Sequence, residues 1–314
     1  MATEATGTTR AAGGAGAPVS DGNGRTPAPG TPHEIARVRV PTRSARGELR
    51  AIKVVWKREL IRFSRDRLRI LTSLMQPFLF LFVLGSGLSS LVSASTHGVS
   101  FRTFIYPGVL CMAVMFTAMF SAASIVWDRE FGFLREMMVA PVRRSSIVLG
   151  KCCGGATVAA FQGVIVLAIA GLVHVPYSLG LLAELFALMV LLAFSITAFG
   201  MMAAARITQM QSFMAIMQMA IMPMFFISGA MFSVVHLERW LAILNRIDPL
   251  TYAVDPMRRA IFAHLHVSAA TRHALAPGVT WWGWHVPSLL EAAVVALLGL
   301  VMLTVAIFEF GRAE

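Results

Sequence analysis

Six long apolar segments constrain this chain more than any other feature. Each is near the roughly 20 residues that an α-helix needs to cross a bilayer. Only helices and closed barrels satisfy their backbone hydrogen bonds in lipid, and these segments do not alternate as barrel strands do. Hydrophobic residues make up 57% of the 314 positions and charged residues 14%. We therefore predict an all-α integral membrane protein with six transmembrane helices, at Ile70–Val92, Phe104–Trp127, Ile147–Val173, Leu179–Ala205, Phe213–Val235 and Leu289–Phe310.

The N-terminal part divides into two regions of different composition. Residues 1–46 are rich in Gly, Ala, Thr, Pro and Arg, which predicts a disordered cytoplasmic tail. Residues 47–69 are basic but carry apolar side chains at helical spacing, which indicates an interfacial amphipathic helix on the inner leaflet. A solvated basic helix is the alternative. Residues 70–314 then form the transmembrane domain. The apolar side chains of the amphipathic helix are Ile52, Val55, Trp56, Leu60 and Phe63.

The distribution of Lys and Arg predicts the orientation. Fourteen of the 27 basic residues precede residue 70, which places this end in the cytoplasm by the positive-inside rule and leaves no need for nucleic acid as a partner. The loops around His97 and His174 are poor in basic residues and should face outward. We predict a multi-pass plasma-membrane protein with both termini cytoplasmic. Five more basic residues mark the connection between the second and third spans as cytoplasmic: Arg129, Arg135, Arg143, Arg144 and Lys151.

The outer connection before the last span has its own pattern. Between about residues 236 and 266, apolar residues at helical spacing alternate with charges, and Pro249 and Pro256 interrupt them. Such segments are too short and too charged to span, so we predict short outer re-entrant helices. Trp281, Trp282 and Trp284 then provide an aromatic anchor at the membrane boundary.

The sequence offers no energy source of its own. The predicted span interiors contain no ionisable residue, because Glu184, Arg206, Glu291 and Glu309 lie near span ends where side chains can reach water. A phosphate-binding loop is also missing, since Gly150-Lys151 is followed by Cys. We predict that this chain binds no cofactor and no metal.

The connection VWDREFGFLREMMVAPVRRSSIVLGK is the most informative stretch. Charged residues from Asp128 to Glu136 alternate with Phe131, Phe133 and Leu134, and Pro141 ends the element. A short helix of this kind could present an apolar knob with a charged rim to a cytoplasmic protein. A solvated loop that touches lipid fits the pattern equally well.

Two segments resemble the ABC-2 family of exporter permeases. The first contains Tyr106-Pro107-Gly108 at the start of the second span and Asp-Arg-Glu-Phe-Gly from Asp128 to Gly132. The second contains Ser228-Gly229 before Phe232, and then Pro-Leu-Thr-Tyr ending at Tyr252. The resemblance covers about residues 48–312, and the drug-resistance branch with daunorubicin-type permeases is most similar in layout. Asp248 departs from the Asn that is common in the family.

The resemblance implies the permease subunit of an ATP-binding-cassette exporter. Such a subunit is not an enzyme; it moves a hydrophobic drug-like, lipid or glycan substrate out of the cytoplasm, as in antibiotic efflux. ATP and Mg bind a separate ATPase subunit, and the permease forms a homodimer or a dimer with a related permease. A coupling helix at 128–140 would contact the ATPase through Asp128, Arg129, Glu130, Phe131, Gly132, Phe133, Leu134, Arg135 and Pro141.

Methionines mark a candidate substrate cavity. They recur on one helical face of the fifth span and on one face of the second. Thioethers are flexible and suit varied apolar ligands, although ordinary helix packing or lipid contact explains them equally well. The cavity residues would be Met112, Met115, Met119, Met210, Met214, Met217 and Met224.

Two other classes of function compete with the permease. A membrane-embedded acyl- or glycosyltransferase with an outer-face site would need convergent catalytic side chains, for which Asp248, Asp255 and His264 are the candidates. A non-transporting membrane anchor or immunity protein is the other. A neighbouring gene for an ATPase would favour the permease.

Overall fold

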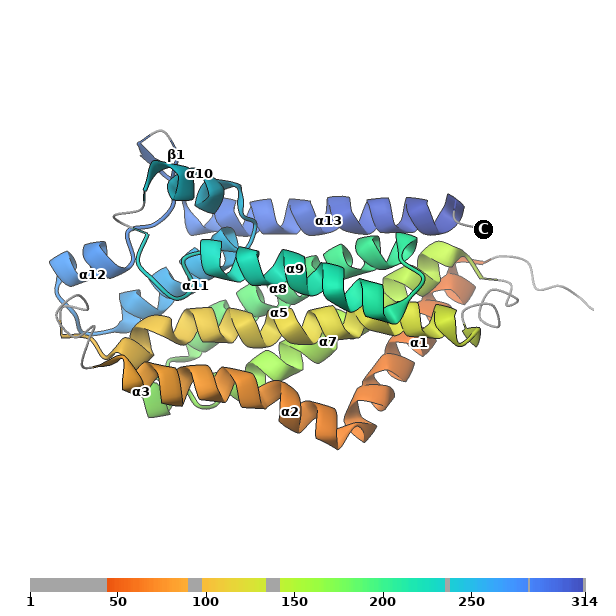
Figure 1. Ribbon diagram of the computed structural model, residues 1–314, viewed down its shortest axis with the longest axis horizontal. Helices are drawn as coiled ribbons and strands as arrows, with labels where there is room; N and C mark the ends of the chain where they lie inside the picture. The colour runs from red at the N-terminus through yellow and green to blue at the C-terminus, as the bar shows by residue number, and fades with distance from the viewer. Residues whose placement is uncertain (1–43, 90–97, 134–141, 235–237, 282, 313–314) are drawn as a thin grey trace, which may run out of the picture. The chain divides into compact units, whose positions relative to one another are not determined.

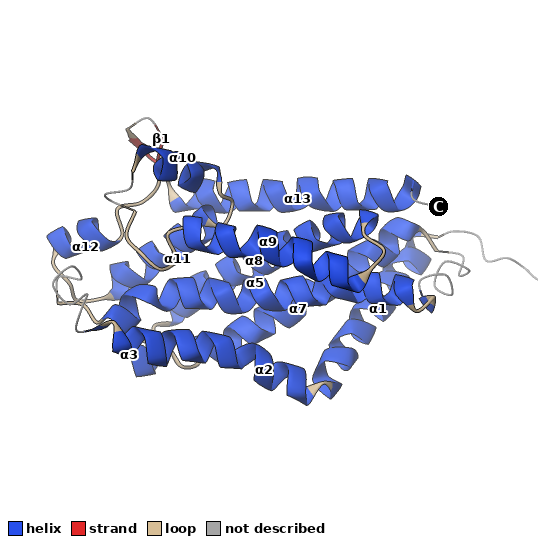
Figure 2. Ribbon diagram, viewed as in Figure 1, coloured by secondary structure: helices blue, strands red, loops and turns tan. Residues whose placement is uncertain are grey.

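The computed structural model describes residues 44–89, 98–133, 142–234, 238–281 and 283–312. Helices make up most of this part, with one antiparallel hairpin (Figure 2). In chain order the elements are α1 (Ala45–Arg65), α2 (Arg67–Phe78), the π-helical segment η1 (Leu79–Leu84), α3 (Gly85–Gly87), α5 (Phe101–Glu130), α7 (Arg144–Leu167), the 3₁₀ helix η2 (Ala170–Val173), α8 (Leu179–Arg206), α9 (Met210–Ile227), α10 (Arg239–Ile247), α11 (Thr251–His264), α12 (Ala269–Leu275), β1 (Thr280–Trp281), β2 (Trp284–His285) and α13 (Ser288–Arg312).

The predicted all-α membrane fold is confirmed. The described part holds six helices that are long and apolar enough to cross a bilayer: Arg67–Gly87, Phe101–Glu130, Arg144–Leu167, Leu179–Arg206, Met210–Ile227 and Ser288–Arg312.

The predicted span boundaries were wrong at the start of the first span, at the end of the third, where α7 stops at Leu167, and at the end of the fifth. The first span begins before Ile70, because the Asp66 carboxylate accepts a hydrogen bond from the Arg69 backbone N–H and so caps α2. The predicted amphipathic helix 47–69 is correspondingly shorter at its end. The fifth span stops at Ile227 although the apolar sequence continues, because the chain turns at Gly229, whose φ of 74° favours glycine.

Helix α5 is the centre of the bundle and packs against α7, α8, α9 and α11 (Figure 1). Small residues let these helices approach closely. A Cβ added at Gly200 on α8 would lie 2.4 Å from the Cβ of Ala122 on α5. A Cβ at Gly155 on α7 would lie 3.0 Å from the Cβ of Ser121. In the most apolar window of α5, 83% of residues are buried, against 17% in the first span and 22% in α9.

The "α1 end" of the bundle holds α1, the last turns of α5, α8 and α13, and the first turns of α7 and α9 (Figure 1). Helix α1 lies obliquely across α7 and meets it at two glycines one turn apart. A Cβ added at Gly150 would lie 3.0 Å from the backbone oxygen of Ile52, and one at Gly154 would lie 2.8 Å from the Cβ of Glu59. The buried face of the basic helix therefore packs on a span.

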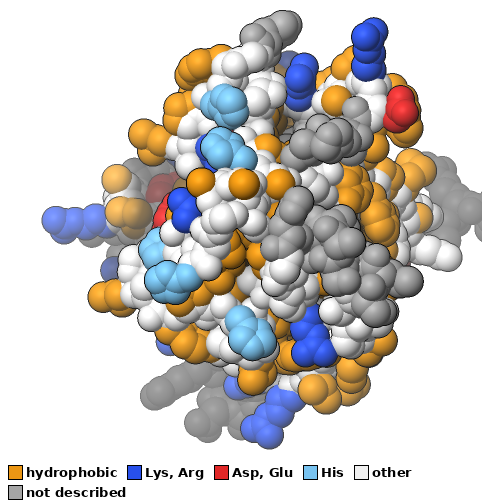
Figure 3. Space-filling view, turned by 90° about the vertical axis from the view of Figure 1, so that its left-hand side faces the viewer, with side chains coloured by type: hydrophobic (Ala, Val, Ile, Leu, Met, Phe, Trp, Pro, Cys, Tyr) orange, Lys and Arg blue, Asp and Glu red, His pale blue; other side chains and the backbone are white. Residues whose placement is uncertain are grey.

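The "α11 end" holds α10, α11, α12 and the hairpin. Helices α10 and α11 occupy the region predicted for the outer re-entrant helices, and α11 is buried against α5, α8 and α13. Pro256 does not interrupt α11, contrary to the prediction, and lies buried inside it. Helix α12 and the β1–β2 hairpin were not predicted. Figure 3 shows histidine side chains gathered on this end.

Candidate functional site

A buried ion cluster fixes the last turn of α5, where the predicted ATPase-coupling segment begins. The Asp128 side chain is 3% exposed, and its Oδ2 lies 2.5 Å from Lys151 Nζ on α7. The same Nζ is 3.0 Å from Glu59 Oε1 on α1. Arg58 Nη2 and Arg62 Nη1 approach Asp128 Oδ1 at 3.0 and 3.6 Å. We call these five residues the α1 ion cluster. It joins α1, α5 and α7 through charges that would be costly to bury unpaired.

Arg129 and Glu130, the next two predicted contact residues, attach α5 to α8 and α9. The Arg129 guanidinium donates to the backbone oxygens of Ala204 and Ile207 at 2.9 and 3.0 Å, where α8 ends and its carbonyls lack helical partners. Glu130 accepts the backbone N–H of Met210 at 3.4 Å, at the start of α9. Both charges also suit the helix dipoles that they meet. The Arg129 side chain therefore faces the end of α8, whereas Glu130 is exposed and contacts the start of α9.

The two aromatic residues after α5 are exposed. Phe131 and Phe133 are 67% and 51% exposed. Between them Gly132 has a φ of 79°, a conformation that ends the helix at no steric cost. Residues 128–130 are the last turn of α5, so no separate helix begins at Asp128, and a coupling role for residues 128–140 stays a prediction. Leu134, Arg135 and Pro141 lie outside the described residues. We call residues 131–133 the aromatic turn.

The chain that returns into α7 is fixed as well. Glu48 accepts from the Arg143 backbone N–H at 3.2 Å and from the Ser146 hydroxyl at 2.5 Å. The Arg144 guanidinium donates to the backbone oxygen of Phe310 at 3.3 Å, near the end of α13. Both flanks of the connection between α5 and α7 are thus held by side chains from distant parts of the chain.

Charged residues inside the spans were missed. Lys151 was counted with the cytoplasmic connection and not as a charge inside a span, but it lies in α7 and its side chain is 1% exposed. Glu291 was expected to reach water, yet it is fully buried with Oε2 2.8 Å from Arg259 Nη2. Arg259 Nε is also 3.0 Å from Asp255 Oδ2. We call Asp255, Arg259 and Glu291 the α11 ion cluster. The glycines around Lys151, four residues apart, were the available signal that this stretch packs on another helix.

The seven candidate cavity methionines separate into two groups. Met112, Met115 and Met119 are buried in the core of α5, and Met217 is buried in α9. Met210 and Met214 line a cavity of about 540 Å³ between α2, α5 and α9. Met224 lines a smaller cavity of about 80 Å³ beside α8 and α13.

The side chains suggested for a transferase each have separate partners. Asp255 belongs to the α11 ion cluster, and His264 Nδ1 lies 2.9 Å from the backbone oxygen of Ala260. Asp248 Oδ1 accepts the Leu250 N–H at 3.0 Å, and burial raises the pKa of this carboxyl to about 7. Within the described residues no hydrogen bond or ion pair joins these three, and no cluster of His, Cys, Asp and Glu could hold a metal ion.

The fold defines the class of this protein as a polytopic α-helical membrane protein. The model of the family "ABC-2 type transporter" matches residues 50–262, and the chain belongs to that family. It is a membrane permease subunit of an ABC transporter. Members of this family work with an ABC ATPase subunit.

Curated relatives agree with this family. Nodulation protein J of Rhizobium leguminosarum bv. trifolii is 30% identical over 67% of this chain and 80% of its own length. The inner membrane transport permease YadH of Escherichia coli K12 is 25% identical over 66% of this chain and 81% of its own length. The transport permease ycf38 of Cyanophora paradoxa is 27% identical over 68% of this chain and 74% of its own length. Multi-pass membrane localisation follows from the family and the six spans.

Proposed function

We propose that this permease exports a hydrophobic drug-like, lipid or glycan substrate from the cytoplasm, driven by ATP hydrolysis on a separate subunit. ATP and Mg bind that subunit, and this chain has no catalytic residue. In this proposal the α1 end faces the cytoplasm, and drug efflux of the antibiotic-resistance type is the activity. The observation that carries the proposal is the aromatic turn, which is exposed, whereas Asp128 and Arg129 just before it are held by ion pairs and hydrogen bonds to other helices.

The aromatic turn has the chemistry of a docking element. Interface energy is concentrated in a few aromatic or Arg anchors that lose all contact with water. Phe131 and Phe133 have large exposed surfaces available for burial in a cleft of the ATPase. A protein partner would therefore gain more from these rings than from the surrounding rim charges.

The attachment of α5 supports transmission of force from such a partner. Asp128, Arg129 and Glu130 connect the base of the aromatic turn to α1, α7, α8 and α9. A displacement of the turn would thus act on several helices together. This arrangement suits a subunit that converts a movement of its partner into a change between its own spans.

Ion pairing of the buried carboxylates argues against coupling to an ion gradient. A coupling carboxylate must bind and release its ion during the cycle. Asp128, Glu59 and Glu291 each lie within ion-pair distance of a cation of this chain. Export driven by ATP remains the function that these pairs favour.

A dimer is part of the proposal, formed with a second copy or with a related permease. Its support is the low burial of two spans. Only 22% of the residues in the most apolar window of α9 are buried, and 17% in that of the first span. Exposed apolar side chains on these helices include Leu71, Met75 and Met219. A second permease that packs here would bury surface that is otherwise left to lipid.

Reconstituted vesicles test the energy source. The permease is inserted with its ATPase, loaded with a fluorescent hydrophobic drug, and supplied either with ATP and Mg or with a proton gradient. We expect transport with ATP alone. Transport with a proton gradient in the absence of ATP would overturn the proposal. Vesicles that contain the permease without the ATPase are the control.

A further inference from the structure

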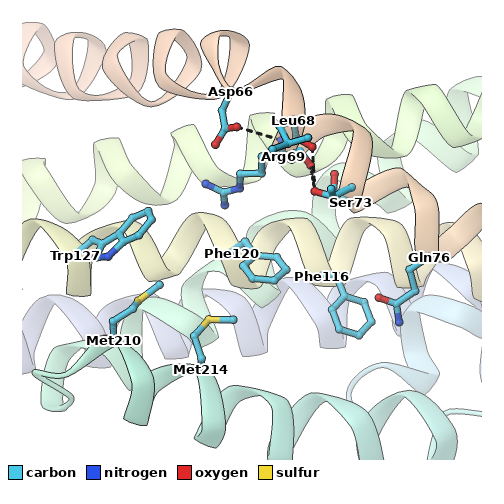
Figure 4. A pocket seen from close by; sticks show the side chains of 11 residues that line it. Asp66, Leu68, Arg69, Ser73, Gln76, Phe116, Phe120, Trp127, Met210 and Met214 are labelled. Carbon is cyan, nitrogen blue, oxygen red and sulfur yellow. Dashed lines mark hydrogen bonds between the residues drawn. The ribbon is translucent and has the colours of Figure 1, made fainter.

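The cavity of about 540 Å³ lies beside the corner where α1 meets α2, and its walls differ in chemistry. The α2 wall is polar and includes Arg69, Thr72 and Gln76. The opposite wall, from α5 and α9, is aromatic and thioether-rich. Figure 4 shows Arg69 extending from α2 toward Phe120, with Met210 and Met214 on the far side. The cavity therefore has one polar face and one apolar face, as an amphiphile has.

Most polar groups on the α2 wall already have hydrogen-bond partners within the protein. The Thr72 hydroxyl donates to the backbone oxygen of Leu68 at 3.0 Å, and the Ser73 hydroxyl donates to that of Ile70 at 3.0 Å. These bonds stay within α2. Among the described residues, the side chains of Arg69 and Gln76 are the ones on this wall that have no hydrogen-bond or ion-pair partner.

Arg69 provides the cation of the cavity. Its guanidinium lies 5.7 Å from the centre of the Phe120 ring, a position that leaves its N–H donors available. Asp66 also lines the cavity, but its carboxylate caps α2 by accepting the Arg69 backbone N–H at 3.1 Å. From residue 62 to residue 69 the chain carries four arginines and one aspartate. The local charge is positive, and a guanidinium with free donors matches phosphate and carboxylate geometry.

We propose that this cavity binds an amphiphile with an anionic head, a phosphate or a carboxylate, which pairs with Arg69. The apolar chain lies against Phe116, Phe120 and Met214. The amphiphile is either an acidic phospholipid of the bilayer or a transported compound of the same charge. In the second case the site deepens the proposed export function and its role rests on that function. Binding itself needs no ATPase.

Quenching of Trp127 fluorescence by bromine measures this binding, because Trp127 lines the cavity. The permease is reconstituted in phosphatidylcholine vesicles, and brominated phosphatidylglycerol or brominated phosphatidylcholine is added in increasing fraction. The signal of a Trp127→Phe variant is subtracted to remove the other tryptophans. We expect saturable quenching that is about tenfold stronger, per lipid, for phosphatidylglycerol. A bromo-fatty acid in the same vesicles tests the transported class.

Variants of one helix locate the charge. Arg69→Gln should weaken binding of the anionic quencher about tenfold, and Arg69→Lys should keep most of it. Arg67→Gln is the matched control, because it removes the same charge from the exposed side of α2. Fatty acid that displaces phosphatidylglycerol assigns the site to a transported anion, and phosphatidylglycerol that resists displacement assigns it to lipid. Equal quenching by both lipids, or equal loss in the Arg67 and Arg69 variants, overturns the proposal, whether or not ATP drives transport.

Discussion

Each end of the bundle uses a buried ion cluster to hold a non-spanning helix, but the two clusters differ in their ratio of basic to acidic residues and in their access to water. In the α1 ion cluster, three cations surround Glu59 and Asp128, and the side chains of Arg58 and Arg62 stay 40% and 35% exposed. In the α11 ion cluster, the single guanidinium of Arg259 serves two carboxylates, and Glu291 is fully buried.

This difference indicates which end can move. Arg58 and Arg62 can exchange Asp128 for water while Lys151 keeps Asp128 paired, so a shift of α1 breaks one buried pair, Glu59 with Lys151, and leaves Asp128 compensated. The α11 ion cluster has no second cation, and a shift of α11 from α13 would separate Arg259 from Glu291. We infer that the α1 end rearranges during the transport cycle and that the α11 end is the fixed end.

The largest effect should come from removal of the buried lysine. Lys151→Met removes from Glu59 and Asp128 a buried cation that contacts both. Breaking a buried pair from one side costs about 3–5 kcal/mol. Thermal unfolding of the purified permease, followed by the loss of monodisperse protein, should show a marked drop in Tm. Lys57→Met removes an exposed lysine from α1 and should leave Tm unchanged. Equal Tm values for both variants would show that the cluster does not stabilise the fold.

A somewhat smaller loss should follow at the other end. Arg259→Met removes the guanidinium that Asp255 and Glu291 share, and because Arg259 is 25% exposed we expect a loss of about 2–3 kcal/mol. Adding Glu291→Gln should restore part of that stability, since one of the two facing charges is then removed. The four proteins of this cycle are compared by thermal unfolding. Additive losses in the double variant would mean that the two residues do not interact.

A pH effect should come from the loop between α10 and α11. Burial raises the pKa of Asp248 from 3.8 to about 7. The unfolded chain therefore loses this proton at lower pH than the folded protein, and stability falls as the pH rises from about 4 to about 7. We expect a loss of about 2 kcal/mol, because local relaxation returns part of the burial penalty. Asp248→Asn should flatten this part of the stability profile. If the Asp248→Asn variant loses stability over this pH range as steeply as the wild type, the pH dependence comes from other groups.

The smallest effect is expected from the exposed pair at the α1 end. Arg206 Nη2 lies 2.6 Å from Glu309 Oε1, but the Arg206 side chain is 75% exposed. Water and salt weaken such pairs to near the limit of detection. Glu309→Gln should therefore leave the Tm unchanged within error. A clear drop would mean that this pair is shielded by lipid or by a second subunit.

Hydropathy and charge predicted the spans, the amphipathic helix and the short outer helices, because these depend on residues close together in sequence. Ion pairs do not. Lys151 meets a carboxylate 92 positions earlier, and its role becomes visible only when α1 lies across α7. Periodicity likewise placed Met112 and Met119 on one helical face without showing that this face is the core. The glycines around Lys151 were the one local signal that could have been used.

The aromatic turn was predicted in part. Its residues were recognised from the alternation of charge and aromatic side chains, and Phe131 and Phe133 are indeed exposed. The inward direction of Asp128 and Arg129 could not be predicted, because their partners lie on α1, α7 and α8. The charges next to the turn thus anchor it, and the contact of the ATPase with the turn itself stays a prediction.

Binding of the partner ATPase to the aromatic turn tests the central claim most directly. Membranes with the wild-type permease, Phe131→Ala or Arg143→Ala are assayed for ATPase affinity and for drug export. Arg143 is the matched control, because its side chain is 67% exposed just before α7. We predict that Phe131→Ala weakens ATPase binding by about 2 kcal/mol, about 30-fold, and abolishes export, while Arg143→Ala has little effect on either. Full binding and export by the Phe131 variant, with loss in the Arg143 variant, would contradict the account.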